Sequence, residues 1–457
     1  MKREYMLDDV IAAISTPMGV GGIGIVRMTG TGCIEIADKI FIGKKKLTEK
    51  ATHTLSYGKI TDPDGEIIDE VLVSVMKAPH TYTKEDIVEI NCHGGSLVTR
   101  RVLEAVLKAG ARIAEPGEFT KRSFLNGRID LTQAEAVIDL IEADTADAAA
   151  NAAGQVDGAL QRKLKPIYED LTNLCSHFHA VLDYPDEDIE DFGLSNYYNM
   201  LKSDGKALYA LLQTYGQGRI LRQGVAAAIV GKPNVGKSSL LNALAGYDRV
   251  IVTEIAGTTR DTVEETVMVG STRLRLIDTA GIRETDDKIE AMGVERSKQA
   301  VENADLVIFV CDGSQPLDSE DWEAINLCTE HQNAIALINK SDIGRAVVPS
   351  DLPFMTVIHI CAKTGEGLDL LADTVDTMFA GNLPCDGSIL TNARQFDAVR
   401  RAYEAMLRAL QALKLGMTPD AALTDVEDAM QAIGEVTGAT VREDITARIF
   451  ERFCVGK

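Results

Sequence analysis

The sequence predicts a multidomain chain with three folding units, one of which is inserted into another. Short alternating strands around a helical stretch predict an α+β domain over residues 1–122. Residues 123–216 and 381–457 carry helical spacing of apolar residues and predict one all-α domain in two parts. Between them, residues 217–380 contain continuous apolar runs typical of buried parallel strands. They predict an inserted α/β domain with a doubly wound, mostly parallel sheet.

Composition narrows the class of protein. With 457 residues, 45% hydrophobic and 25% charged, the chain has the make-up of an ordinary globular protein. Its net charge of −22 disfavours broad electrostatic binding of nucleic acid, so an RNA substrate requires a local basic surface or a partner. Eight cysteines without a C-x-x-C pair predict reduced thiols and no zinc site. The first residues lack a signal-peptide core and no apolar run has membrane-spanning length, so we expect a cytoplasmic protein.

Three polar positions stand out in the α+β domain: Arg27, Glu85 and His93. Spacing alone favours a structural or merely exposed role for each of them. The glycine-rich turn at 19–24 suggests dinucleotide binding, but a further β-rich stretch follows it in place of a helix, which argues against that function. Residues 114–131 contain a Pro-Gly turn and are expected to link this domain to the next.

The two helical parts are expected to contain several long helices. Pro166 is expected to interrupt the first stretch, and Gly416 and Gly434 are expected to end helices in the second part. The predicted helical ranges are 131–182, 196–215, 393–415, 419–434 and 437–450.

The central motif of the inserted domain is Gly231-x-x-x-x-Gly236-Lys237-Ser238, which follows an apolar run and begins a helical stretch. The glycines let successive backbone N–H groups face phosphate oxygens, and the helix directs its positive end at the anion. Lys237 supplies a cation for the β and γ phosphates, and Ser238 supplies a hydroxyl for Mg²⁺. The motif therefore predicts a P-loop.

Three further motifs follow in the order of a nucleotide switch. Residues 252–261 offer a threonine hydroxyl to complete the Mg²⁺ shell, and Asp278 begins a D-x-x-G motif whose Gly281 N–H can contact a γ-phosphate. In Asn339-Lys-Ser-Asp342, the aspartate can accept hydrogen bonds from the N1–H and 2-amino group of guanine, which adenine lacks. Cys361-Ala-Lys363 stands where a second base contact is expected. Together the four motifs predict a GTP-binding domain.

The group that orients the attacking water is not evident from the motifs. Ile282 follows the D-x-x-G motif, where small GTPases carry a glutamine. The next residues form an acidic loop, which is either a solvated loop or the source of a base. Spacing does not choose among its members Glu284, Asp286, Asp287, Glu290 and Glu295.

The P-loop, together with Gly257-Thr-Thr-Arg-Asp261, resembles that of the potassium-dependent branch of translation-factor-type GTPases, which includes the TrmE/Era-like group. The resemblance implies a K⁺ ligand at Asn234 and further backbone or hydroxyl ligands at Thr253, Ile255 and Thr258, ahead of Thr259 as an Mg²⁺ ligand. K⁺ there places positive charge where an arginine finger acts in other GTPases. The expected nucleotide contacts are Asn234, Val235, Gly236, Lys237, Ser238, Ser239, Thr253, Glu254, Ile255, Ala256, Gly257, Thr258, Thr259, Asp278, Thr279, Ala280, Gly281, Asn339, Lys340, Asp342, Cys361, Ala362 and Lys363.

Further markers along the whole chain resemble the MnmE (TrmE) family of tRNA modification GTPases. They are the segments 21–27, 82–86, 93–95, 116–119, 125–131, 184–189 and the terminal Cys454-x-Gly-Lys457. Cys361 departs from the serine usual at its position. The useful contact there is largely a backbone N–H, so GTP specificity is expected to survive this change.

This resemblance implies a function for each domain. The N-terminal domain is implied to form a homodimer and to bind a tetrahydrofolate one-carbon donor (5-formyl or 5,10-methylene) through Arg27, Glu85, Arg128 and Lys457. Glu290 matches the general base of GTP hydrolysis. With an FAD protein of the MnmG type in a heterotetramer, the family adds aminomethyl or carboxymethylaminomethyl groups to C5 of the wobble uridine of certain tRNAs.

Three points remain open at the level of the sequence. Cys454 is a candidate nucleophile for C6 of uridine, although the family's chemistry is largely credited to the flavin partner. The four nucleotide motifs also suit a ribosome-assembly GTPase, or a folate-binding module with negligible turnover. The absence of a KH-like G-x-x-G segment and the terminal Cys-Val-Gly-Lys favour tRNA modification.

Overall fold

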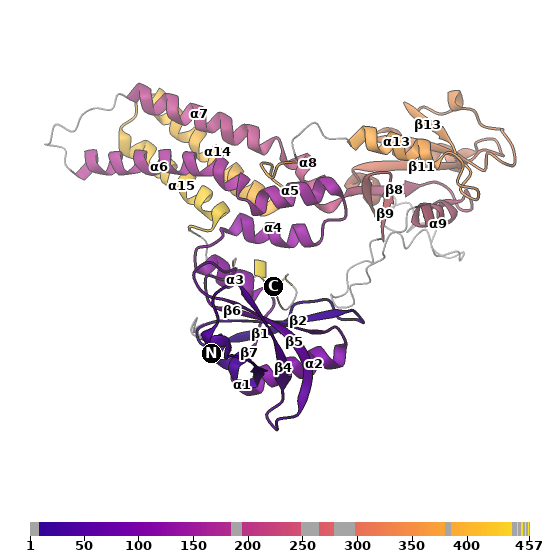
Figure 1. Ribbon diagram of the computed structural model, residues 1–457. Helices are drawn as coiled ribbons and strands as arrows, with labels where there is room; N and C mark the ends of the chain where they lie inside the picture. The colour runs from indigo at the N-terminus through magenta and orange to yellow at the C-terminus, as the bar shows by residue number, and fades with distance from the viewer. Residues whose placement is uncertain are drawn as a thin grey trace.

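A computed structural model describes residues 9–183, 194–247, 265–277, 298–379 and 385–440, and also Thr446, Ile449, Phe450, Phe453 and Gly456. The chain forms an N-terminal sheet, a layer of long helices and a second sheet beside those helices (Figure 1). Helix α4 (Leu131–Ile141) lies between the N-terminal sheet and the other helices. The C-terminal end returns to the N-terminal sheet. No helix in these described ranges has the length and apolar character needed to span a bilayer.

The N-terminal sheet has seven strands in the order β3-β4-β5-β6-β2-β1-β7. Its neighbours are antiparallel except for β1 and β7, and the β1–β2 hairpin confirms that a strand follows the glycine-rich turn. Two helices and the sheet share a core that includes Val26, Met28, Val88 and Val102. The elements are β1 (Ile11–Ile14), β2 (Ile23–Thr29), α1 (Cys33–Ile40), β3 (Phe41–Gly43), η1 (Leu47–Glu49), β4 (Thr54–Thr61), β5 (Ile67–Met76), β6 (Ile87–His93), α2 (Ser96–Ala109) and β7 (Arg112–Ile113).

Two short helices of this region were not predicted from the sequence. One is α1, and the other is α3 (Glu118–Leu125), which lies within the residues expected to be a linker. Each has only eight residues, so its apolar periodicity is too short to separate it from a loop.

The helical layer contains α4, α5 (Ala146–Val156), α6 (Ala159–Asp183), α7 (Leu194–Leu212) and α8 (Tyr215–Gln223) before the second sheet, and α14 (Ala393–Lys414) and α15 (Pro419–Thr437) after it. The two parts share one core, which includes Leu164 and Leu171 of α6 and Val399 and Val426 of the later helices. An ion pair between Arg394 and Glu135, 2.8 Å from Nε to Oε1, joins them again. The separated helical stretches therefore form one body.

Three sequence expectations fail in this layer. Pro166 lies inside α6, where buried leucines on both sides offset the roughly 3 kcal/mol cost of an interior proline. The predicted helical range 196–215 also fails, because α7 ends at Leu212 and a separate helix, α8, begins at Tyr215 and runs through the glycines at 216 and 218. Gly434 lies inside α15, which continues to Thr437. A Cβ at 434 would lie 2.6 Å from Thr440 Oγ1, so the glycine lets the Thr440 side chain pack closely against the helix.

The second sheet has the order β13-β12-β11-β8-β10-β9 and is parallel except for the β9–β10 pair. Apolar clusters cover its two faces. This confirms the doubly wound, mostly parallel sheet. Its elements are β8 (Val225–Val230), α9 (Lys237–Tyr247), β9 (Glu265–Val269), β10 (Thr272–Leu276), β11 (Leu306–Asp312), α12 (Ser319–Thr329), β12 (Ala334–Asn339), η2 (Pro349–Asp351), β13 (Thr356–His359) and α13 (Leu368–Phe379).

Candidate functional sites in the inserted and N-terminal domains

The P-loop connects the fully buried strand β8 to the start of α9, as the motif predicts. Gly236 has φ 103°, and a Cβ at this position would lie 2.2 Å from Nδ2 of Asn339. Only glycine fits this combination of backbone conformation and close approach. The loop is therefore shaped for backbone N–H groups to face an anion at the carboxyl edge of the sheet.

The Lys237 ammonium lies within the curve of this loop. It donates to the carbonyl oxygens of Gly231 at 2.5 Å and of Lys232 at 2.9 Å. Burial lowers the pKa of Lys237 below its usual value, so an anionic partner would be electrostatically favoured beside it. Ser238 and Ser239 follow on the exposed side of the first turn of α9.

Asn339 joins three of the predicted motifs. Its amide nitrogen donates to the Val235 carbonyl at 2.8 Å, and its amide oxygen accepts from the Ala362 N–H at 3.0 Å. Lys340 next to it donates to the Asn234 carbonyl at 3.0 Å and pairs with Asp312 at 2.7 Å. The P-loop and the two base-contact segments therefore lie in contact with one another at the carboxyl edge of the sheet.

The remaining base-contact positions lie on the same edge. Asp342 and Lys363 are exposed, whereas Cys361 is buried and its N–H donates to the Glu366 carbonyl at 2.9 Å. The Cys361 N–H is therefore used within the fold, and its thiol is buried away from this edge.

Two charged contacts at this edge were not predicted: that of Asp312 with Lys340, and that of Lys232 in the P-loop with the start of α12. Asp312 ends β11, directly after a buried apolar run, which is a signal that places it at the carboxyl edge of the sheet. Lys232 pairs with Asp318 at 2.6 Å and Asp321 at 2.8 Å at the start of α12. No sequence spacing indicates that second contact, because it joins residues more than 80 positions apart.

Several predicted positions lie outside the described residues. They are Thr253, Glu254, Ile255, Ala256, Gly257, Thr258, Thr259, Asp278, Thr279, Ala280, Gly281, Glu290, Cys454 and Lys457.

In the N-terminal domain, Arg27 and Arg128 each lie over an aromatic ring of one small cluster, in which Tyr82 packs against the buried residues that include Phe119. Arg128 Cζ lies 5.0 Å from the centre of the Tyr82 ring, and Arg27 Cζ lies 5.9 Å from that of Phe119. Burial raises the pKa of Tyr82, while a hydrogen bond with Thr120 and the charges of Arg128 and Arg27 oppose this shift. Two predicted folate positions, far apart in sequence, therefore meet at one place.

The C-terminal end reaches this place as well. Ser15 Oγ donates to the Gly456 carbonyl at 3.1 Å, and Arg27 Nη1 donates to it at 3.5 Å. Arg27 is also paired with Glu89 at 2.7 Å. Gly456 directly precedes Lys457, which lies outside the described residues.

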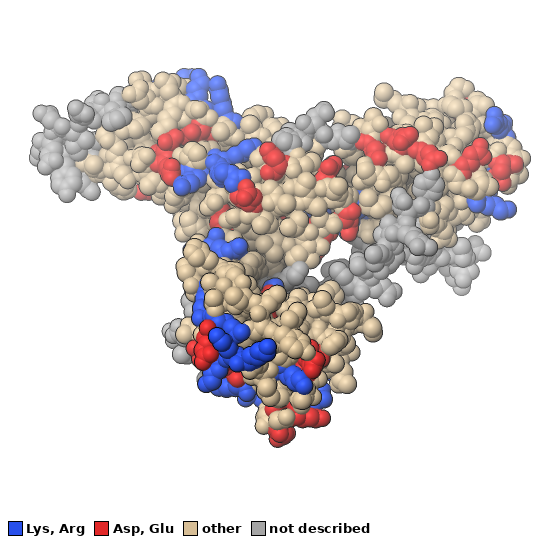
Figure 2. All heavy atoms as spheres, viewed as in Figure 1, with Lys and Arg blue, Asp and Glu red and all other residues tan. Residues whose placement is uncertain are grey.

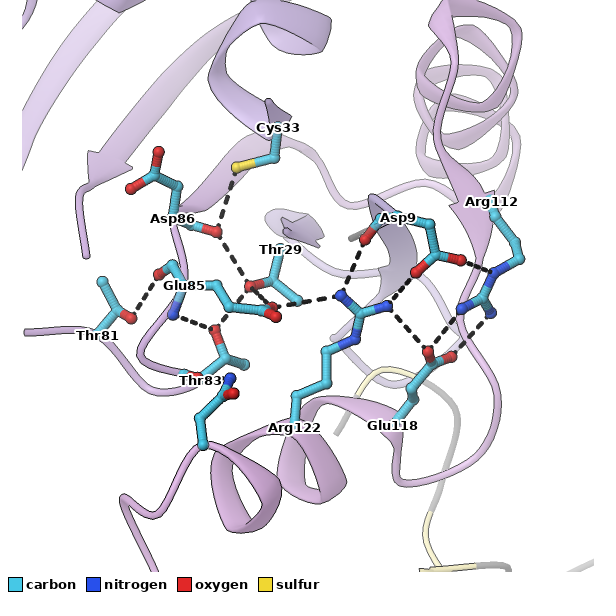
Figure 3. Close-up of polar contacts among 11 residues, drawn as sticks. Asp9, Thr29, Cys33, Thr81, Thr83, Glu85, Asp86, Arg112, Glu118 and Arg122 are labelled. Atoms are coloured by element: carbon cyan, nitrogen blue, oxygen red, sulfur yellow. Dashed lines mark hydrogen bonds and ion pairs between the residues drawn. The ribbon is translucent and has the colours of Figure 1, made fainter. Parts of the chain in front are cut away.

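Glu85 lies in the turn before β6, and its side chain is 14% exposed (Figure 3). Its Oε2 accepts from Thr29 Oγ1 at 3.1 Å and from Arg122 Nη1 at 3.3 Å. His93, by contrast, is 73% exposed and contacts Asp69 at 2.7 Å, as expected for a surface residue. On the face shown in Figure 2, Lys and Arg side chains gather over the N-terminal domain and are interspersed with Asp and Glu.

Comparison with known proteins decides the family. The model of the MnmE helical domain matches residues 131–454, and the model of the TrmE N-terminus matches residues 10–128. The tRNA modification GTPase MnmE of Streptococcus pneumoniae (strain Hungary19A-6) is 45% identical over 460 residues, covering 100% of this chain and 99% of the relative. The chain belongs to the MnmE family. MnmE of Acetivibrio thermocellus is 43% identical over 457 residues, covering 98% of this chain and 99% of that relative.

Membership of the MnmE family makes this chain a GTPase of tRNA modification. Among solved structures, Aquifex aeolicus Era bound to GDP and aluminium fluoride aligns with 40% of this chain and 67% of its own, at 32% identity and a TM-score of 0.26.

Proposed function

We propose that this chain is a K⁺-activated GTPase that acts with an FAD-dependent partner of the MnmG type, as a heterotetramer that binds tRNA. The pair adds aminomethyl or carboxymethylaminomethyl groups to C5 of the wobble uridine of certain tRNAs. The proposal rests chiefly on the full-length similarity to MnmE proteins. Two contacts support it: Asn339 hydrogen-bonds to the P-loop, and Arg128 lies over the Tyr82 ring in the N-terminal domain.

The residues around the P-loop suit the nucleotide and its cations. Lys237 holds the β and γ phosphates, and the hydroxyls of Ser238 and Thr259 are the proposed Mg²⁺ ligands. Asn234, the proposed side-chain ligand of K⁺, has an exposed side chain and a backbone held by Lys340 at a φ of 63°. K⁺ supplies positive charge beside the phosphates when it is bound. Its remaining proposed ligands are Thr253, Ile255 and Thr258, and Glu290 is the proposed general base.

The N-terminal site suits a tetrahydrofolate derivative. Such a ligand has a glutamate tail with carboxylates, an aromatic middle and a pterin ring with adjacent N–H donors. Arg27 and Arg128 provide guanidinium groups for carboxylates, Tyr82 and Phe119 provide aromatic surface, and Glu85 provides an acceptor. Lys457 is the fourth proposed contact. Cys454, three residues earlier, is kept as a candidate nucleophile.

Exposed apolar side chains on one face of the N-terminal sheet support a homodimer. Alternate residues of β4 and β5 point away from α1 and α2, and Leu55, Tyr57 and Leu72 are 65%, 67% and 46% exposed on that side. Tyr57 and Leu72 are directly opposite each other in the β4–β5 register. A contiguous apolar patch on a sheet face is typical of a subunit interface. We assign dimerisation and folate binding to residues 1–122.

GTP hydrolysis in different salts tests the catalytic part of this proposal. Purified full-length protein is assayed in KCl and in NaCl at equal ionic strength, as wild type and as Asn234→Ala. We expect hydrolysis by the wild type to be at least ten times faster in KCl, and the variant to lose that preference. Equal rates of the wild type in both salts contradict K⁺ activation.

A further inference from the structure

An ion network centred on a buried arginine lies beside Glu85 in the N-terminal domain (Figure 3). Its centre is Arg122 of α3, whose side chain is 3% exposed. Arg122 pairs with Asp9 at 2.5 Å, Glu118 at 3.2 Å and Glu85 at 3.3 Å. A guanidinium this deeply buried needs such partners, because an unpaired buried charge is strongly destabilising.

The other carboxylates of the network are held by a second guanidinium. Arg112 pairs with Asp9 at 2.7 Å and with both oxygens of Glu118 at 2.7 and 2.9 Å. Burial raises the pKa values of Asp9 and Glu118, but hydrogen bonds outweigh it: those from Arg112 and Arg122 to Asp9, and those from Arg112 and the Glu115 N–H to Glu118. Both pKa values therefore lie below their usual range. These two carboxylates are therefore ionised, and each is paired with both arginines.

The charges of the network do not cancel. Asp9, Glu85 and Glu118 carry three negative charges when ionised, against two positive charges on Arg112 and Arg122. Asp9 and Glu118 each contact both arginines, whereas Glu85 contacts Arg122 at the longest distance in the network. The uncompensated negative charge therefore resides mainly on Glu85, the member proposed to face a ligand.

The orientation of Glu85 follows from the same contacts. Arg122 and Thr29 both bind Oε2, and Oε1 has no partner among the described residues. Helix α3 also holds the turn around Glu85, because Asn126 Nδ2 donates to the Thr83 carbonyl at 2.7 Å and Thr120 Oγ1 contacts Tyr82 Oη at 2.9 Å. One oxygen is thus anchored and the other is left for a donor.

We infer that Arg122 is a positioning residue of the N-terminal site, acting through Glu85. It fixes Oε2 and so presents Oε1 to the N–H donors of the ligand ring, while Asp9 and Glu118 hold Arg122 in place. The inference rests on the proposed folate-binding function of this site. It adds that Arg122 sets the orientation of the Glu85 carboxylate, the proposed acceptor of hydrogen bonds from the ligand.

A double-mutant cycle separates positioning from a general role in stability. The dissociation constant of 5-formyltetrahydrofolate is measured by calorimetry for the full-length wild type, Glu85→Gln, Arg122→Gln and the double variant. We expect each single variant to bind about ten-fold more weakly or worse, because each loses a charge-assisted hydrogen-bond arrangement. The double variant is expected to bind no more weakly than Glu85→Gln alone.

Further variants keep the test decisive if Arg122→Gln does not fold. Arg122→Lys retains the charge but not the planar fork, and Asp9→Asn loosens Arg122 from a partly exposed position. Both are expected to weaken folate binding in the wild-type background and not in the Glu85→Gln background. Arg101→Gln is the matched control, because Arg101 is an exposed arginine of α2 that pairs with Glu66. It is expected to bind folate as the wild type does.

Two results overturn the inference. If the losses from Glu85→Gln and the Arg122 variants add in the double variant, Arg122 does not act through Glu85, and the proposed folate function stands. If the wild type does not bind the folate at all, the proposed ligand is wrong, and the inference falls with it.

Discussion

The side-chain amide of Asn339 donates to the backbone carbonyl of Val235 at 2.8 Å. This hydrogen bond ties the end of β12 to the P-loop across residues 104 positions apart. The same side chain accepts from the Ala362 N–H, so one amide couples the phosphate loop to both base-contact segments. GTP binding is therefore expected to depend on Asn339 through this coupling, in addition to its predicted contact with the nucleotide.

Asn339→Ala is expected to weaken GTP binding by about ten-fold to a hundred-fold. The change leaves the buried Val235 carbonyl without its donor, which costs roughly 1–3 kcal/mol. Titration with a fluorescent GTP analogue measures the effect, and Gln332→Ala, an exposed residue before the same strand, is the control. Wild-type affinity in Asn339→Ala contradicts the coupling.

Asp342→Asn is expected to exchange guanine for xanthine specificity. The carboxylate accepts from two donors of guanine, whereas an amide can donate to the 2-oxo group of xanthine. Competition of GTP and XTP for the variant measures the change, and the wild type should prefer GTP by at least a hundred-fold. If Asp342→Asn keeps that preference, another residue recognises the base.

Gly456→Ala is expected to impair the N-terminal site and to leave the GTP site intact. Gly456 has φ 103°, and a Cβ there would lie 2.4 Å from the Ile14 carbonyl oxygen. The strain should move the C-terminal end away from Arg27 and weaken folate binding about ten-fold. Gly205→Ala in α7 is the control, since a Cβ there meets nothing within 4 Å. Folate affinity equal to wild type in Gly456→Ala means that the C-terminal end does not build the site.

The stability of the helical layer is expected to depend on pH through Asp204. Burial, with a smaller contribution from the charge of Asp170, raises the pKa of Asp204 to about 7, and Oδ2 has no hydrogen-bond partner among the described residues. The folded state holds this proton more tightly than the unfolded state does. Protonated Asp204 therefore makes its full contribution to the stability of the folded state at pH values below the pKa of Asp204 in the unfolded chain. That contribution is lost as pH rises through about 7.

Asp204→Asn should therefore stabilise the protein at pH 8 relative to the wild type, on the order of a few kcal/mol, and have little effect at pH 4. Urea unfolding followed by circular dichroism at both pH values measures the difference. The exposed Asp157→Asn is the control. An equal effect of Asp204→Asn at both pH values contradicts the raised pKa.

Local patterns in the sequence predicted the parts of the fold that depend on short spacing. The P-loop, the apolar runs of β11 and β12 and the amphipathic helix α14 follow from residues within about twenty positions of one another. Pro166 was misread because the local rule for proline ignores the buried leucines that hold α6 together. Tertiary packing overrode the local preference at that position.

The residues of the candidate sites, like the fold, could be predicted only in part, because tertiary contacts between distant segments determine the rest. The nucleotide motifs were found by their spacing and the folate positions by resemblance to a family, but the contacts that orient these residues join distant segments. Arg122 meets Asp9 across 113 positions, and Asn339 meets Val235 across 104. No periodicity in a single sequence records such a pairing, so these orienting residues became visible only in the folded chain.

The most direct test of the account is nucleoside mass spectrometry of bulk tRNA. Cells lacking this chain are compared with the same cells carrying the wild type, Asp342→Asn or the Gly205→Ala control. We predict that 5-aminomethyl-type wobble uridines disappear without the chain and return with the wild type and the control but not with Asp342→Asn. Unchanged wobble uridines in every strain, with no second copy of the gene present, would contradict a role in tRNA modification and favour a ribosome-assembly GTPase.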